Sequence, residues 1–404
     1  MKKNLRRKLD KLTKFVNSGY LLIFAAVLGL VLANLPTYNI FDEFSKYQIH
    51  LPFYMNLSVE NLVEEGLLTI FFLNVGLDLK HEFLFGPFND KKKALLPIIS
   101  AAGGVIVPAL FFLSIVFFAG QFQVLASGWA IPSVTDIALS LAVLSFILLK
   151  KFNDSDKLFV KSSKTFLMTL AVADDIFGIL IIALFYSRSV NFIYLFFALI
   201  FVCVWRLFSQ FDSSFKWLIL VPLGLAAWYF TFKSGVHTAI IGAILGFTIA
   251  AAPKKNNWKS RIVKYRDFTS VISGLFVLPI YIFFKMKINF IEIFNTVLYS
   301  ETSYSVIIVI AAIAMALAIG KPAGIMLFTY ISDRWTPFTL ESSLNLKNIW
   351  SISCLAGIGF TVSFLIADLS FISPIIILSA RLGVIIGSLL SVFLAYLFCV
   401  KNIE

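Results

Sequence analysis

The sequence predicts an all-helical protein that crosses a membrane many times. Of its 404 residues, 59% are hydrophobic and only 14% are charged, whereas soluble globular domains are close to one quarter charged. Many apolar runs reach about 20 residues, the length that a helix needs to cross the hydrocarbon core of a bilayer. These runs are continuous rather than alternating, which favours helices over a barrel. We therefore expect a polytopic membrane protein of the all-α class.

Charged or turn-rich gaps divide the chain into twelve expected spans. They cover approximately residues 18–35, 59–79, 94–118, 125–149, 164–186, 190–208, 214–232, 236–252, 268–285, 303–329, 349–369 and 373–400. The basic segment before the first span could belong to a signal peptide. However, no small-residue cleavage site follows it and many further spans do, so we interpret it as a cytoplasmic tail before a retained span.

The distribution of lysine and arginine supports this count. When the N-terminus is placed in the cytoplasm, about 27 of the 34 basic residues fall on the cytoplasmic side, as the positive-inside rule predicts. The asymmetry indicates an even number of spans, with both termini cytoplasmic. The net charge of +12 is then explained by membrane topology, and nucleic acid is not expected as a partner.

Three spans contain residues that a helix facing lipid would avoid. Span 4 carries Pro132, span 10 carries Lys321-Pro322, and span 11 carries Gly357 and Gly359. Interrupted helices leave backbone groups unpaired, and such ends form ion sites in transporters. Spans 4 and 11 hold equivalent positions in two blocks, spans 3–5 and spans 10–12, which suggests an inverted repeat.

Asp174 and Asp175 stand side by side in the apolar run 170–186. Each charge at bilayer depth costs roughly 2.5–3.5 kcal/mol on insertion scales. The pair therefore requires a partner, a bound cation or protons. The alternative is a solvated pair near a helix end, but apolar residues precede and follow the two aspartates.

Three further residues complete the candidate site. Thr135 and Asp136 follow Pro132 in a segment suited to a loosened helix that offers oxygens to a hard cation; the alternative is a helix cap. Lys321 is the expected counter-charge, and the alternative is a lysine that snorkels to the interface. Asp136, Asp174, Asp175 and Lys321 together carry a formal charge of −2. Such a group in a low dielectric holds a cation or protons. Because it can take up more than one proton per monovalent cation, we expect exchange to move net charge.

Two enzymatic uses of membrane aspartates are disfavoured. An intramembrane aspartyl protease usually carries Gly-x-Gly-Asp, but Gly359 is followed here by Phe360. A prenyltransferase uses Asp-Asp-x-x-Asp, and the third acid is missing after Asp175. We expect a protein that is not an enzyme and that has no cofactor.

Seven stretches, in this order and at compatible spacing, carry a resemblance to a known family. They are FFLNVGLDLKHE (71–82), GGVIVPAL (103–110), GWAIPSVTDIALSLAVL (128–144), FLMTLAVADDIFGILIIALFY (166–186), KSGVHTAIIGAILGF (233–247), IGKPAGIMLF (319–328) and AGIGFTVSFLIA (356–367). Through them the sequence resembles the NhaA family of bacterial sodium/proton antiporters nearly end to end. This family is itself a known example of an inverted-repeat transporter fold, so the repeat inferred above is not independent of the resemblance.

The resemblance implies roles for the site residues. Asp174 and Asp175 would be the transport pair, with Asp175 ligating Na⁺ or Li⁺ and exchanging it for protons. Asp174 would pair with Lys321 in one state of the cycle. Thr135 and Asp136 would belong to broken span 4, which crosses broken span 11.

The resemblance also implies residues for ion entry and pH response. Asp78 and Glu82 match carboxylates of the cytoplasmic funnel, Glu65 falls where the family often carries an aspartate, and His237 matches a histidine linked to pH sensitivity. From the residues alone, Glu65 would equally be a solvated charge and His237 a packing or capping residue. The segment 261–267 departs from the family pattern, which puts the pH response in doubt.

We thus expect residues 1–404 to form one transporter domain, with spans 3–5 and 10–12 as a core and spans 1–2 and 6–9 as a panel. It would use the inward proton gradient to expel Na⁺ or Li⁺ across a bacterial cytoplasmic membrane. The alternative function is a proton-coupled symporter or a cation channel on the same fold. Alternation in the segment 37–57 allows a β-hairpin that forms a homodimer, as in relatives.

Overall fold

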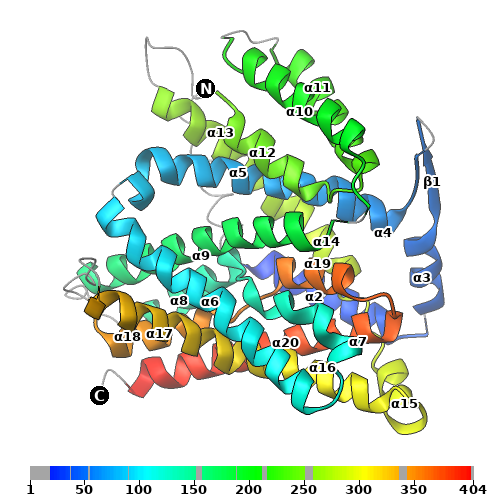
Figure 1. The fold of residues 1–404 in the computed structure, drawn as a ribbon, viewed down its shortest axis with the longest axis vertical. Coiled ribbons are helices and arrows are strands. Elements are labelled where there is room, and N and C mark those ends of the chain that lie inside the picture. Colours follow the sequence, from blue (N-terminus) through cyan, green and yellow to red (C-terminus); the bar gives the residue numbers. More distant parts are fainter. Residues whose placement is uncertain are drawn as a thin grey trace. The chain divides into compact units, whose positions relative to one another are not determined.

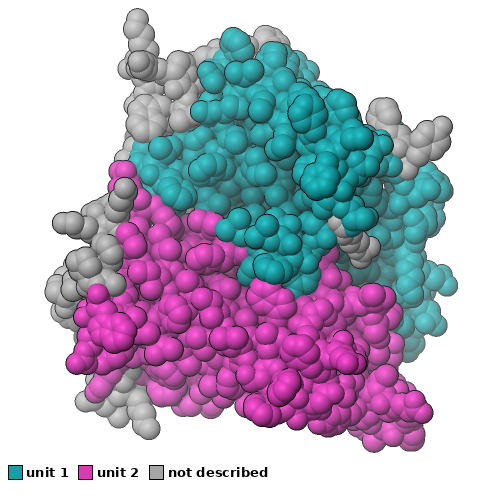
Figure 2. All heavy atoms as spheres, viewed as in Figure 1, with its two compact units in different colours: residues 1–86, 179–287 teal, residues 87–178, 288–404 magenta. Residues whose placement is uncertain are grey.

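A computed structural model describes residues 19–36, 38–52, 55–89, 91–151, 157–187, 189–211, 216–250, 258–335 and 344–401. The basic N-terminal segment, and with it the predicted position of the N-terminus, lies outside these residues. The chain divides into two compact units, residues 1–86 with 179–287 and residues 87–178 with 288–404 (Figure 2). Each unit is built almost entirely of helices (Figure 1).

Unit 1 contains a series of helices and one β-hairpin (Figure 1). Its elements are α2 (Tyr20–Ala33), α3 (Tyr38–Lys46), β1 (Gln48–Leu51), β2 (Met55–Ser58), α4 (Val59–Leu62), η1 (Val63–Leu67), α5 (Leu68–Phe85), α10 (Phe192–Phe208), α11 (Lys216–Ser234), α12 (Ala239–Thr248), α13 (Trp258–Ile272), η5 (Ser273–Val277) and α14 (Leu278–Lys285).

Unit 2 contains the remaining helices, including most of α9. Its elements are η2 (Pro87–Asn89), α6 (Lys91–Phe118), α7 (Phe122–Leu125), η3 (Ala126–Ser133), α8 (Ile137–Lys151), α9 (Lys157–Phe185), α15 (Phe290–Tyr299), α16 (Ser303–Met315), η6 (Ala316–Gly320), α17 (Lys321–Trp335), α18 (Leu346–Ala356), α19 (Thr361–Ser370) and α20 (Pro374–Lys401).

The helical membrane fold predicted from the sequence is confirmed, although the number of spans is not. Among the described residues, six helices are long and apolar enough to cross a membrane, and three bent helix pairs raise this number to nine. The other three predicted spans correspond to α5, α10 and α12. Helices α10 and α12 are apolar but shorter, and α5 carries charges near its end. The count of twelve stays a prediction.

The predicted breaks in spans 4 and 11 are confirmed. In span 4 the helical path ends at Ser133 and resumes at Ile137 with a bend of 53°. In span 11 it ends at Ala356 and resumes at Thr361 with a bend of 56°. Each break is four residues or fewer and leaves helix-end amides and carbonyls without partners inside their own helix.

Span 10, which carries Lys321-Pro322, is not broken like spans 4 and 11. Helices α16 and α17 form one continuous span, joined by the π-turn η6. The Lys321 amide donates to the carbonyl of Ala316, five residues earlier, and Pro322 follows in the first turn of α17. Proline has no amide to donate and its ring clashes with the preceding turn. The wider turn accommodates that ring without ending the helix.

Helices α6 and α17 of unit 2 approach each other closely through two glycines. A Cβ atom on Gly103 would collide with the carbonyl of Gly324, and a Cβ on Gly324 would collide with that of Gly103. Small residues allow membrane helices to pack with their backbones in contact. This contact fixes α17 one turn after Lys321, the residue that carries the counter-charge.

The predicted hairpin in the segment 37–57 is present, but the sequence did not reveal the helix before it. Strands β1 and β2 pair antiparallel, with Ile49 opposite Leu57. Helix α3 occupies residues 38–46, stabilised by an Asp42–Lys46 ion pair one turn apart. Helix α15 was likewise not predicted; it is capped by Asn289, whose side chain accepts from the amides of Ile291 and Glu292.

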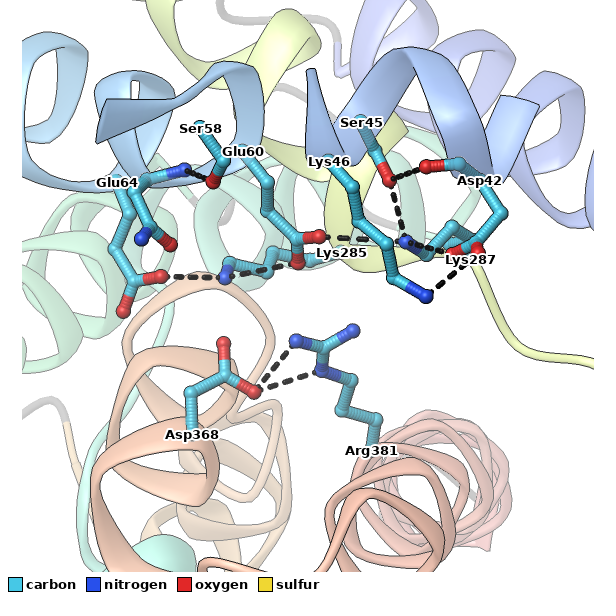
Figure 3. Close-up of polar contacts among 11 residues, drawn as sticks. Asp42, Ser45, Lys46, Ser58, Glu60, Glu64, Lys285, Lys287, Asp368 and Arg381 are labelled. Carbon is cyan, nitrogen blue, oxygen red and sulfur yellow. Dashed lines mark hydrogen bonds and ion pairs between the residues drawn. The ribbon is translucent and has the colours of Figure 1, made fainter. Parts of the chain in front are cut away.

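Two lysines at and just after the end of span 9 form ion pairs with residues on either side of this hairpin (Figure 3). Lys285, whose side chain is 1% exposed, lies 2.7 Å from Glu64 and 3.5 Å from Glu60. Lys287 lies 3.0 Å from Asp42 and 3.4 Å from Glu60. Glu60 is therefore shared by both ammonium groups. Paired in this way, two lysines that would be costly to bury alone can remain charged.

Two lysines, Lys46 and Lys287, act on the carboxylate of Asp42. Burial raises the pKa of Asp42, but hydrogen bonds and charge from Lys46 and Lys287 outweigh this effect and lower the pKa below its usual range. Asp42 therefore remains ionised at neutral pH and continues to bind Lys287. The network joins α3, α4 and η1 to the end of α14 within unit 1.

Replacement of Glu60 tests this network. Glu60→Gln removes the carboxylate that both lysines share, and we expect the free energy of unfolding to fall by about 2 kcal/mol because a buried ammonium loses a charged partner. Thermal unfolding of the purified protein in detergent measures the change. Glu43→Gln, at an exposed position on α3, is the matched control and should melt like the wild type. Equal melting temperatures for the two variants would contradict this account.

Candidate ion-binding site

The centre of the candidate site is a fully buried ion pair in unit 2. Asp174, on α9, and Lys321, the first residue of α17, are both 0% exposed. The Lys321 ammonium donates to Oδ2 of Asp174 at 2.7 Å and to the carbonyl of Ser133 at 2.8 Å. Ser133 ends the first half of broken span 4, so the ammonium also satisfies one of the carbonyls that the break exposes. Lys321 therefore does not snorkel to the interface.

Thr135 joins the ion pair to the second broken helix. Its hydroxyl lies 2.6 Å from Oδ2 of Asp174 and 2.7 Å from the carbonyl of Ala356. A hydroxyl carries one proton and can donate to only one of these oxygens at a time. When Asp174 is ionised, both oxygens compete for that proton. When Asp174 is protonated, it can donate to Thr135, which then donates to Ala356.

Asp174 retains further capacity to bind. Its second oxygen, Oδ1, is buried and has no hydrogen-bond partner among the described residues. A buried carboxylate oxygen without a donor is costly. It is suited to a proton or a cation.

Asp136 lies at the meeting point of two half-helices. Its Oδ1 accepts from the Leu139 amide at 3.1 Å, which caps the start of α8. Its Oδ2 accepts from the amide and the hydroxyl of Thr361 at 3.3 and 3.0 Å, at the start of α19. The Asp136 amide donates to the carbonyl of Ile358 at 2.7 Å. A carboxylate at two helix N-termini is stabilised by both helix dipoles, so the capping alternative describes its contacts in this structure.

Asp175 is also buried, with 7% of its surface exposed. As the next residue on α9, it points about 100° away from Asp174. The two aspartates thus point in different directions from the same helix, and Asp174 contacts Lys321 directly.

Hydroxyl side chains that the sequence did not single out bind the two breaks together. Ser140 donates to the carbonyl of Leu355 at 2.9 Å, and Ser363 donates to that of Ile131 at 2.8 Å. Each bond crosses from one broken span to the other. Serine or threonine close to a break in an apolar span is the signal that could have indicated them.

Two of the predicted pH-response residues come together in unit 1. Glu65 lies in the π-turn η1, and its Oε2 accepts from the Thr238 hydroxyl at 2.6 Å. His237 is 3% exposed at its side chain and places Nε2 3.9 Å from Oε1 of Glu65. The Ala239 amide donates to Nδ1 of His237 at 3.2 Å. The ring therefore both caps a helix and faces a carboxylate.

The other two predicted pH-response residues, Asp78 and Glu82, lie on α5. Asp78 accepts from Asn74 at 2.9 Å and lies 3.8 Å from Nε of Arg266. Glu82 is buried, 3.4 Å from the ring of His81. Arg266 belongs to the segment that departs from the family pattern. It supplies a permanent positive charge opposite Asp78.

Comparisons with known proteins place this arrangement in a family. Residues 10–399 match the family model described as Na⁺/H⁺ antiporter 1. The chain is 37% identical to the Na⁺/H⁺ antiporter NhaA of Mycolicibacterium smegmatis, over 93% of this chain and 84% of the relative. It is 34% identical to that of Bifidobacterium adolescentis, over 93% and 83%, and 33% identical to that of Haemophilus influenzae, over 94% and 91%. The chain belongs to the Na⁺/H⁺ antiporter 1 family, the family of the NhaA antiporters.

Proposed function

We propose that this protein exchanges Na⁺ or Li⁺ for protons across a bacterial cytoplasmic membrane. The relatives reported above are named Na⁺/H⁺ antiporters, and six helices of the described residues are long and apolar enough to span a membrane. The exchange uses the inward proton gradient to expel the metal cation. It requires no cofactor, because the transported ions themselves bring about the change in charge.

The observation that carries the proposal is the buried Asp174–Lys321 pair with Asp175 beside it. Two carboxylates and one ammonium carry a net charge of −1 when all are ionised, in a region shut away from water. Low dielectric makes an uncompensated charge costly. Either a monovalent cation or a proton removes the excess charge, and the two therefore compete for the same oxygens.

Exchange follows from this competition. Asp175 offers its carboxylate to the cation, while Lys321 and Thr135 hold Asp174. When the cation leaves, the uncompensated carboxylate takes up a proton. When the proton leaves, the cation is favoured again. If the site opens to one side of the membrane at a time, each opening exchanges one kind of ion for the other. Thr135 and Asp136 supply further oxygens and hold the broken helices around the pair.

The residues of unit 1 provide the proposed route and pH response. Asp78 and Glu82 would attract cations at the cytoplasmic end of α5. Glu65 and His237 would respond to protons. The permanent charge of Arg266 beside Asp78 counteracts cation attraction there. We place both termini in the cytoplasm from the lysine and arginine distribution, and we assign a homodimer to the hairpin of β1 and β2.

Everted membrane vesicles with a pH-sensitive dye test the exchange. Addition of Na⁺ or Li⁺ should release protons accumulated in the vesicles, because the cation displaces them from Asp175. Asp175→Asn removes the charge that both ions compensate and should abolish the response. Glu292→Gln, an exposed carboxylate on α15, is the matched control. Exchange by the Asp175→Asn variant, or no proton movement with the wild type, would refute the proposal.

The same vesicles report the charge moved per cycle. When Asp136 is included, the group of three carboxylates and one ammonium carries a formal charge of −2 and can take up more than one proton per monovalent cation. Exchange then moves net charge across the membrane, so an imposed membrane potential should change its rate. A potential-sensitive dye measures this dependence. A rate independent of the potential would show electroneutral exchange.

The Asp174–Lys321 pair is tested by charge compensation. Lys321→Gln leaves a buried carboxylate without its ammonium, and we expect a loss of about 3 kcal/mol or more in the free energy of unfolding. Adding Asp174→Asn removes the remaining charge and should restore most of this stability, although the double variant should not exchange ions normally. Thermal unfolding in detergent measures both. The account fails if the double variant melts no higher than Lys321→Gln.

A further inference from the structure

A second buried ion pair lies in unit 2, formed by residues other than Asp174 and Lys321. Nε of Arg381, on α20, donates to Oδ1 of Asp368, on α19, at 2.8 Å, and Nη2 of Arg381 lies 2.6 Å from the same oxygen (Figure 3). The side chains are only 7% and 10% exposed. A buried ion pair rarely stabilises a protein more than apolar residues of the same size would, and its best-attested use is to fix register.

The two helices that carry the pair are held together at a second point. Asp368 lies seven residues after Thr361 on α19, and Arg381 lies seven residues before Ser388 on α20. The hydroxyl of Ser388 accepts from the Gly359 amide at 3.3 Å, next to the start of α19. The two contacts are seven residues apart on α20, about two helical turns, whereas Gly359 lies nine residues before Asp368, in the break that precedes α19. Helices α19 and α20 therefore run antiparallel and are joined near both ends of α19.

The start of α19 is the part that reaches the ion site. Thr361 donates to Asp136 through its amide and its hydroxyl. The break before it, residues 357–360, contributes no continuous helical hydrogen bonding that would fix α19 to α18. A shift of α19 by one residue would move Thr361 by about 1.5 Å, enough to break hydrogen bonds of this length. Ser363 holds the first turn of α19 to span 4 through the carbonyl of Ile131, and the Asp368–Arg381 pair holds its last turn to α20.

We propose that Asp368 and Arg381 are positioning residues for ion exchange: their ion pair fixes the register of α19 and so keeps Thr361 on Asp136. This inference rests on the proposed exchange function. The pair binds no transported ion. Arginine remains charged at all physiological pH values. The positive charge that binds Asp368 is therefore present throughout a cycle in which carboxylates of the site gain and lose protons.

The Na⁺ concentration for half-maximal proton release distinguishes positioning from a structural role. Asp368→Asn keeps the shape of the side chain but removes its charge. We expect this concentration to rise about tenfold, the lower end of the loss seen when a group that orients a metal ligand is removed. The maximal rate should stay within about twofold of the wild type. Arg381→Lys, which keeps the charge but loses the planar fork, should be intermediate. Glu60→Gln, which lowers stability in unit 1, should leave the Na⁺ dependence unchanged.

A double variant tests whether Asp368→Asn raises the half-maximal Na⁺ concentration by displacing Thr361. In a Thr361→Val background one hydrogen bond to Asp136 is already lost, so Asp368→Asn should raise the half-maximal Na⁺ concentration by less than it does alone. An undiminished effect would overturn the proposal, as would a wild-type Na⁺ dependence in Asp368→Asn. Either result would reject the positioning role alone. The proposed exchange function would still hold, provided that the wild type exchanges ions.

Hydrogen–deuterium exchange provides a readout that does not require transport. Asp368→Asn should accelerate exchange of the backbone amides in the first turn of α19. Ser370→Ala, which removes only a hydrogen bond to Ile366 within the same helix, should not. Equal exchange in this turn for the wild type and Asp368→Asn would overturn the positioning role even if the wild type moved no protons.

Discussion

A carboxylate removed from water requires compensation, and the structure of unit 2 satisfies this constraint in two different ways. Asp136 is surrounded by amide donors from the starts of two half-helices, together with one hydroxyl. Those amides are part of the backbone and leave only if the helices move. Asp174 is compensated by the Lys321 side chain and by Thr135, both of which can change partner by rotation alone. The first arrangement suits a fixed joint between helices, and the second suits a site that exchanges its charges during a cycle.

The broken helices make these arrangements available. An unbroken span would satisfy its own backbone and offer nothing to an ion. Here the backbone carbonyls that the breaks leave without helical partners accept hydrogen bonds from side chains. The carbonyl of Ser133 accepts from the Lys321 ammonium, and the carbonyl of Ala356 accepts from the Thr135 hydroxyl. The same groups that hold the two broken spans together therefore also line the candidate ion site. The positioning role proposed for Asp368, seven residues after Thr361 on α19, depends on this arrangement.

The residue types of the candidate site could be predicted from the sequence more readily than the contacts that join them to distant helices. The adjacent aspartates in an apolar run predicted the candidate site, and proline or glycine within spans 4 and 11 predicted both breaks, because each conflicts with a helix facing lipid. The pairing of Asp136 with Thr361, 225 residues further along the chain, depends on how distant helices pack, which local pattern does not encode. The π-turn before Pro322 was missed for a related reason, since a proline alone does not distinguish a wide turn from a break. The partners of the lysines at the hairpin base could not be predicted for the same reason: they lie on α3, α4 and η1.

In the proposed exchange, the metal cation and the proton compete for the same buried carboxylates. Binding at equilibrium tests this competition most directly, without transport. Purified protein in detergent, in a weakly buffered solution with a pH indicator, is titrated with Na⁺ and compared with the same titration by choline. Na⁺ binding should release protons, and the number released should fall as the starting pH is raised, because the carboxylates are then already ionised. Saturable Na⁺ binding with no proton release at any pH would contradict this competition.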